Sequence, residues 1–133
     1  MKKVYMMVDF MGDAEVEYKE ITDFFGKAFP KESCDFHRGK LPHDLSNDLC
    51  DFYVFDFGGL MPGCTDMVSS QFNELVRQVA DHPNTVFIMW SSFTRLSYEE
   101  AMQEIFEHEE PQHNVVYRGE DDEVLIKKIK AML

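Results

Sequence analysis

Side chains that could bind a metal ion and a phosphoryl group follow several apolar runs of this sequence. Asp9 and Asp56 each lie at the end of such a run, and Asp13 follows Asp9 by four residues. Ser91 and Arg118 come directly after two later runs. Carboxylates are ligands that Mg²⁺ prefers, while hydroxyl and guanidinium groups bind phosphate oxygens. We therefore predict a candidate magnesium site at Asp9, Asp13 and Asp56. In it, Asp56 is the phosphoacceptor or nucleophile, and Ser91 and Arg118 contact the phosphoryl group.

The run that carries Asp56 is the best-defined strand signal in the chain. Residues 50–57 are rich in aromatic and β-branched side chains, and the run stops at Gly58-Gly59. It is too short for a helix, so a central buried strand is the better interpretation. The two glycines predict a tight turn, because they lack the further glycines of a nucleotide-binding loop. Such a strand carries Asp56 to the edge of the sheet.

The remaining segments alternate between strand and helix patterns. Apolar runs predict strands at residues 3–10, 33–37, 85–90 and 114–117. Helical spacing of apolar residues predicts helices at residues 14–29, 65–82, 97–110 and from 120 onward. The expected buried stripes include Val16 in the first helix and Val124 in the last. Residues 38–49 are expected to form a crossover, with one or two helical turns beginning at Pro42.

This alternation predicts one α/β domain that spans residues 1–133. Strands separated by helices need crossover connections, so the five-stranded sheet should be mostly parallel and covered on both faces. We expect a three-layer, doubly wound, flavodoxin-like fold with strand order 2-1-3-4-5. In that order the ligand crevice lies at the carboxyl ends of the first and third strands, which carry Asp9 and Asp56. The same topology gathers polar loop residues at this edge whether or not they do chemistry, so a purely structural role remains an alternative.

Composition and net charge limit the classes of partner, cellular location and metal site that are expected. The chain has 133 residues and a net charge of −12, which disfavours nucleic acid and anionic membranes because both carry negative charge. No apolar run approaches the roughly 20 residues that span a bilayer, so a cytoplasmic location is expected. Three cysteines fit reduced thiols better than a disulfide framework, and the five histidines lack the short spacing of zinc sites. No cofactor other than magnesium is predicted.

The residues around Asp56 resemble those of receiver domains of two-component signalling. The resemblance implies that Asp56 accepts phosphate, that Asp9 is one of two metal-binding acids, and that Ser91 or Ser92 is the switch hydroxyl. The turn Met61-Pro62-Gly63 matches the segment that follows the acceptor. The sequence also departs from the pattern. Phe10 stands where a second acid is expected, and Arg118-Gly119 replaces a Lys-Pro pair, which weakens the case for magnesium and phosphotransfer.

Residues 54–60 also resemble the first motif of the haloacid dehalogenase superfamily. That resemblance implies that Asp56 is a phosphatase nucleophile and that Ser91 binds phosphate. Gly58 occupies the position of the family's second carboxylate, and Gly119-Glu120 only faintly matches the closing acidic motif. The match covers about seven residues, so it ranks below the receiver-like interpretation.

Three functional hypotheses remain open at this point. The first is a non-enzymatic regulatory or protein-binding module on a receiver-like fold whose phosphoacceptor site is incomplete, with another protein or a second copy of the chain as its partner. The second is a magnesium-dependent phosphotransfer or phosphohydrolase enzyme that uses Asp56. The third is an acidic interaction protein without a cleft, in which a helical face presents glutamates to a partner. These glutamates are Glu99, Glu100, Glu104, Glu107, Glu109 and Glu110.

Overall fold

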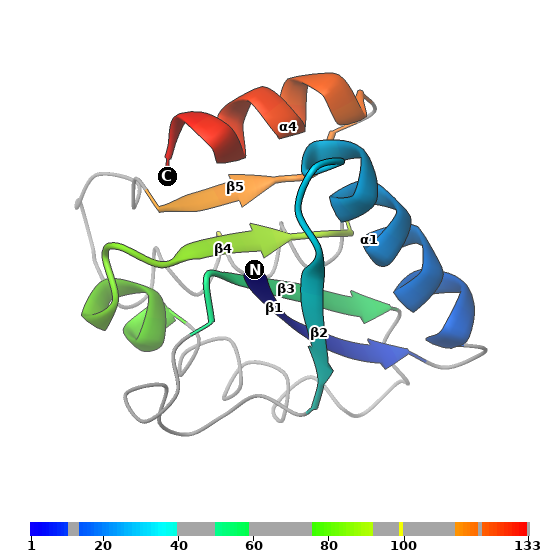
Figure 1. Ribbon diagram of the computed structural model, residues 1–133. Helices are drawn as coiled ribbons and strands as arrows, with labels where there is room; N and C mark the ends of the chain where they lie inside the picture. The colour runs from blue at the N-terminus through cyan, green and yellow to red at the C-terminus, as the bar shows by residue number, and fades with distance from the viewer. Residues whose placement is uncertain are drawn as a thin grey trace.

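Five parallel strands form a single sheet in the order β2-β1-β3-β4-β5 (Figure 1). The structure is a computed structural model that describes residues 1–10, 14–39, 50–58, 76–91, 99, 114–119 and 121–132. The elements are β1 (Lys2–Phe10), α1 (Ala14–Ala28), β2 (Cys34–Arg38), β3 (Phe52–Gly58), β4 (Val86–Met89), β5 (Val115–Tyr117) and α4 (Asp122–Ala131). The predicted fold class and strand order are therefore confirmed.

All five predicted strands are present, with small differences at their ends. The helix predicted at residues 65–82 is described only at residues 76–81, which are helical. The helix predicted at residues 97–110 is described only at Glu99, which is also helical. The crossover predicted at residues 38–49 lies outside the described residues from position 40 onward, as does the turn at residues 61–63. No helix in the described part of the chain is long and apolar enough to cross a membrane.

Helices α1 and α4 cover one face of the sheet. Even-numbered residues of β1, β3 and β4 share one hydrophobic cluster with Phe24 and Phe25 of α1 and with Leu125 and Ile129 of α4. These strand residues are Val4, Met6, Phe52, Val54, Val86 and Ile88. They belong to one cluster because side chains on a strand alternate between faces, and the strands pair in register.

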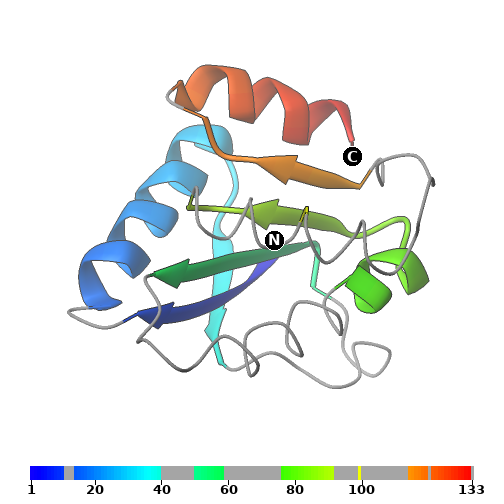
Figure 2. The same cartoon turned by 180° about the vertical axis from the view of Figure 1, so that it is seen from behind.

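The opposite face of the sheet is equally buried. Tyr53 and Phe55 of β3 and Phe87 and Met89 of β4 are each at most 2% exposed. The Tyr53 and Phe87 rings stack with centroids 5.4 Å apart. Figures 1 and 2 show the sheet from its two sides, with α1 and α4 flanking it. Burial on both faces explains why these strands read as continuous apolar runs in the sequence, and it is the burial expected of the three-layer arrangement.

Two predicted core positions are wrong. Val16 of α1 is 54% exposed and Val124 of α4 is 48% exposed. On a helix with 3.6 residues per turn, Val16 lies far around the axis from the buried Ile21, and Val124 lies about 100° from its buried neighbour Leu125. Both valines are therefore displaced from the stripe that faces the sheet.

The Asn114 side chain links the end of the helical segment at residues 76–81 to the residues just before β4. Its side chain is buried, and its amide nitrogen donates to the carbonyl oxygens of Val79 (3.1 Å), His82 (2.9 Å) and Thr85 (3.1 Å). The main-chain carbonyl oxygen of Asn114 accepts from the N–H of Phe87 at 2.9 Å. The side chain thus satisfies carbonyls at the end of a helical segment, and the main chain positions the first residues of the strand.

We predict that Asn114→Ala lowers the free energy of unfolding by about 1–3 kcal/mol, because buried carbonyl oxygens lose their donor. Urea unfolding followed by circular dichroism measures the change. The control is Asn84→Ala, which changes an exposed asparagine two residues before β4 and should shift stability by less than about 0.5 kcal/mol. Equal losses in the two variants would show that the three hydrogen bonds contribute no net stability.

Candidate functional site

Four residues occupy one register level at the carboxyl ends of β1, β3, β4 and β5. Val8 pairs with Asp56. Trp90 and Arg118 continue the level, since the Trp90 N–H donates to Phe55 at 2.9 Å and the Arg118 N–H donates to Met89 at 3.0 Å. We call Val8, Asp56, Trp90 and Arg118 the carboxyl-edge row. Their side chains fall on the face that α1 and α4 cover, because residues paired in register share a face.

Two of the predicted site residues, Asp56 and Arg118, belong to the carboxyl-edge row. Asp9 pairs with Phe57, one register position farther along β1 and β3. Ser91 follows Trp90, also one position beyond the row, and is half-buried. Asp13 lies outside the described residues, as does Ser92.

Asp56 is buried against a second carboxyl group from α1. The residue is only 2% exposed, and its Oδ1 atom has no hydrogen-bond partner within the structure described. The Glu17 side chain lies within hydrogen-bonding reach of Asp56, so two carboxyl groups are neighbours at this edge of the sheet. Their like charges disfavour the ionised form of Glu17.

The surroundings of Glu17 change the pKa of its carboxyl group. Burial raises the pKa of the Glu17 carboxyl, and the hydrogen bond and the negative charge of Asp56 raise it further. Arg118 acts in the opposite direction, because its positive charge lowers the same pKa. Glu17 is half-buried in the first turn of α1, and this helix end brings it to the carboxyl edge of the sheet.

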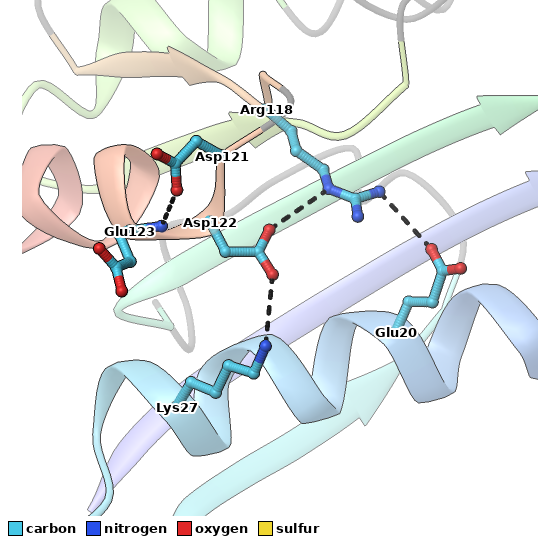
Figure 3. A network of polar contacts seen from close by, with 6 residues as sticks. All are labelled: Glu20, Lys27, Arg118, Asp121, Asp122 and Glu123. Carbon is cyan, nitrogen blue, oxygen red and sulfur yellow. Dashed lines mark hydrogen bonds and ion pairs between the residues drawn. The ribbon is translucent and has the colours of Figure 1, made fainter.

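Arg118 is held by an aromatic ring and by two helices (Figure 3). Its guanidinium lies 4.2 Å from the centre of the Trp90 ring. Its nitrogens approach Glu20 of α1 (3.5 Å) and Asp122 of α4 (4.0 Å). Asp122 also pairs with Lys27 of α1 at 3.8 Å, so the charges link α1, α4 and the end of β5.

Trp90 separates the acidic part of the row from the basic part. It is 3% exposed, and its ring packs edge-to-face on Phe24 with centroids 5.6 Å apart. Its indole nitrogen has no hydrogen-bond partner in the described structure. Because Trp90 lies between Asp56 and Arg118 in the row, a large apolar ring stands between the carboxylate and the cation.

Most of the predicted magnesium site lies outside the side chains that the structure describes. Of the predicted ligands Asp9, Asp13 and Asp56, only Asp56 has a described side chain. The described side chains contain no group of three or more His, Cys, Asp or Glu residues arranged to hold an ion. One or two carboxylates with water can bind Mg²⁺, and Glu17 is a second carboxyl group beside Asp56.

Sequence reasoning did not identify Glu17 or Trp90 as site residues. Glu17 reads as an acid in the first turn of a helix, where it favours the helix dipole. Trp90 reads as the last apolar residue of a strand. The strand order could have indicated Glu17 and Trp90, because it brings the start of α1 and the ends of β3 and β4 to one edge of the sheet.

Comparisons with protein-family models, with curated proteins and with solved structures found no match to this chain. The arrangement of the chain's own residues therefore carries the functional argument.

We predict that the raised pKa of the Glu17 carboxyl makes stability depend on pH. A raised folded pKa contributes stability that is fully present below the ordinary glutamate value of 4.5 and is lost as pH rises through the raised value. Glu17→Gln removes this contribution, so its urea midpoint should fall less than that of the native protein from about pH 4 to about pH 8. The exposed Glu32→Gln variant controls for the loss of one carboxylate. Identical slopes in native protein and Glu17→Gln would contradict the prediction.

We predict that Arg118→Ala lowers the free energy of unfolding by about 1–2 kcal/mol, because it removes a guanidinium–indole contact and two ion pairs that are partly shielded from water. Arg118→Lys should restore only part of this loss, since lysine lacks the planar group that stacks on an indole. The matched control is Lys19→Ala, which breaks the exposed Lys19–Asp23 pair at 3.0 Å. That variant should change stability by less than about 0.5 kcal/mol, and an equal effect of Arg118→Ala would refute the linking role.

Proposed function

We propose that this chain is a cytoplasmic regulatory module that binds a protein partner and that has a receiver-like fold without phosphotransfer at Asp56. The observation that carries the proposal is the burial of Asp56, which is 2% exposed and shares a hydrogen bond with Glu17. A residue in this position stabilises the junction of β3 and α1. Because its carboxyl group is enclosed, it is poorly placed to meet a substrate.

Phosphotransfer to a carboxylate makes demands that this environment does not favour. The nucleophile must be ionised, and it must reach the phosphorus in line with the leaving group. Positive charge, commonly a metal ion, must also neutralise the phosphoryl oxygens. Beside Asp56 lies a second carboxyl group, that of Glu17, whose negative charge when ionised would oppose the approach of a phosphoryl group. These features support a structural role for Asp56.

The other members of the row support the same proposal. The receiver resemblance implies a hydroxyl at the end of the fourth strand, but Trp90 occupies the row position there and Ser91 comes one residue later. The resemblance also implies a lysine after the fifth strand, where this chain has Arg118. Arg118 is engaged with Trp90, Glu20 and Asp122. A guanidinium held by three neighbours is less available to a phosphoryl group.

A binding role agrees with the character of the described surface. Among the residues that the structure describes, the large hydrophobic side chains that are exposed are Met1, Val16 and Val124. Met1 precedes β1, Val16 is on α1 and Val124 is on α4, so these three described side chains belong to different segments, whereas obligate interfaces usually bury large apolar areas. A partner that meets this part of the surface would therefore recognise it mainly through charged and polar contacts.

We predict that the native protein forms no phosphoryl adduct when it is incubated with Mg²⁺ and acetyl phosphate, because Asp56 is buried and lies beside a second carboxyl group, that of Glu17. Intact-protein mass spectrometry measures the adduct, and thermal unfolding with and without Mg²⁺ should show no metal-linked stabilisation.

Two variants make this experiment decisive. Asp56→Asn removes the acceptor, so an adduct on the native protein that disappears in this variant would overturn the proposal and favour the phosphotransfer hypothesis. Glu17→Ala removes the carboxyl that encloses Asp56. An adduct that forms in Glu17→Ala but not in the native protein would support Glu17 as the group that blocks the chemistry.

A further inference from the structure

Lysines gather around one aromatic ring at the amino edge of the sheet, opposite the carboxyl-edge row. The ammonium of Lys2, the first residue of β1, lies 6.0 Å from the centre of the Phe29 ring. The ammonium of Lys130, in the last turn of α4, lies 5.7 Å from the same ring. Lys31 is exposed in the turn that follows Phe29. We call Lys2, Lys31 and Lys130 the amino-edge basic patch.

The fold brings these lysines together from distant parts of the sequence. The turn after α1 lies beside β1, because the N–H of Lys2 donates to the carbonyl of Ser33 at 3.3 Å. Phe29 is 8% exposed and belongs to the core cluster, which Met132 after α4 also contacts. The Phe29 ring is therefore packed in the core, and the ammonium groups of Lys2 and Lys130 both lie near it.

The charges of the patch are not neutralised within the described part of the chain. No described carboxylate forms an ion pair with any of its three lysines, whereas Lys19 pairs with Asp23 and Lys27 pairs with Asp122. The acid of the same turn is Glu32, whose charge and that of Lys2 both act on Cys34. Like charges held close together repel, so an anionic group bound between them would be favoured.

We propose that the amino-edge basic patch docks an acidic segment of a protein partner. The proposal rests on the binding role proposed above and names the chemistry of its partner. Side-chain carboxylates of such a segment would contact the Lys2 and Lys130 ammonium groups, and Lys31 would add attraction at the rim. A short acidic segment fits better than a polyanion, because the net charge of −12 would repel a nucleic acid or an anionic membrane over most of the surface.

A fluorescently labelled peptide that carries two or three glutamates among neutral residues is the probe that tests this proposal. Fluorescence anisotropy should show binding at low salt that weakens as salt is added, because exposed charge pairs are screened. The double variant Lys2→Ala/Lys130→Ala should bind about fivefold or more weakly, since two charge contacts are lost. Glu32→Gln should bind more tightly, because the acid of the same turn is removed.

Lys19→Ala/Lys128→Ala is the matched control. It changes the net charge by the same amount and also removes one lysine from the last turn of α4. Lys128 lies two residues from Lys130 and so points to a different side of the helix. This control should bind the peptide within about twofold of the native protein if the location of the charges matters.

Three outcomes would overturn the proposal. The native protein could fail to bind the peptide, or the two double variants could lose affinity equally. Phosphatidylserine vesicles could also bind through Lys2 and Lys130 while the peptide does not, which would assign the patch to a membrane. The acetyl phosphate experiment tests Asp56 and the peptide experiment tests the lysines, so failure of the patch is distinguishable from failure of the proposed function.

Discussion

Burial of β3 on both faces is the constraint on which the rest of the structure depends. This strand lies between β1 and β4, and every side chain from Phe52 to Asp56 is at most 2% exposed. Alternate residues therefore supply both layers of the core, with Phe52 and Val54 facing α1 and α4 and Tyr53 and Phe55 facing the other side. The same geometry carries the last of these residues, Asp56, out of water.

Enclosing a carboxyl group requires compensation, and α1 provides it. An isolated ionised carboxylate in a low-dielectric interior is strongly disfavoured, so the group either finds a partner or remains protonated. Glu17 gives Asp56 a polar neighbour, and burial together with Asp56 raises the pKa of the Glu17 carboxyl. Trp90 then fills the next position of the row, and Arg118 ties that edge to α1 and α4. A reactive carboxylate would need to be accessible to a substrate, whereas the described contacts bury Asp56 and engage Arg118.

The charges at the helix ends are distributed along the edges of the sheet. Both α1 and α4 begin with acids and end with lysines, a pattern that stabilises each helix dipole. Glu17 of α1 and Asp122 of α4, both in first turns, lie near the carboxyl-edge row, where Glu17 neighbours Asp56 and Asp122 pairs with Arg118. The last turn of α4 brings Lys130 near Phe29, whereas Lys27 in the last turn of α1 pairs with Asp122 instead.

The sequence by itself determined the strands, the positions of helices α1 and α4 and the sheet order, because continuous apolar runs and helical periodicity are local consequences of burial. It also determined that Asp56 ends the central strand. Only the tertiary structure decided that Glu17 faces Asp56, that Trp90 lies beside it in the row, and that Lys2 and Lys130 share one ring. It also decided which side of each helix faces the sheet, which left Val16 and Val124 exposed. The physical reason is that a local pattern specifies an element and its apolar side, whereas the neighbours of a side chain depend on how elements far apart in sequence pack.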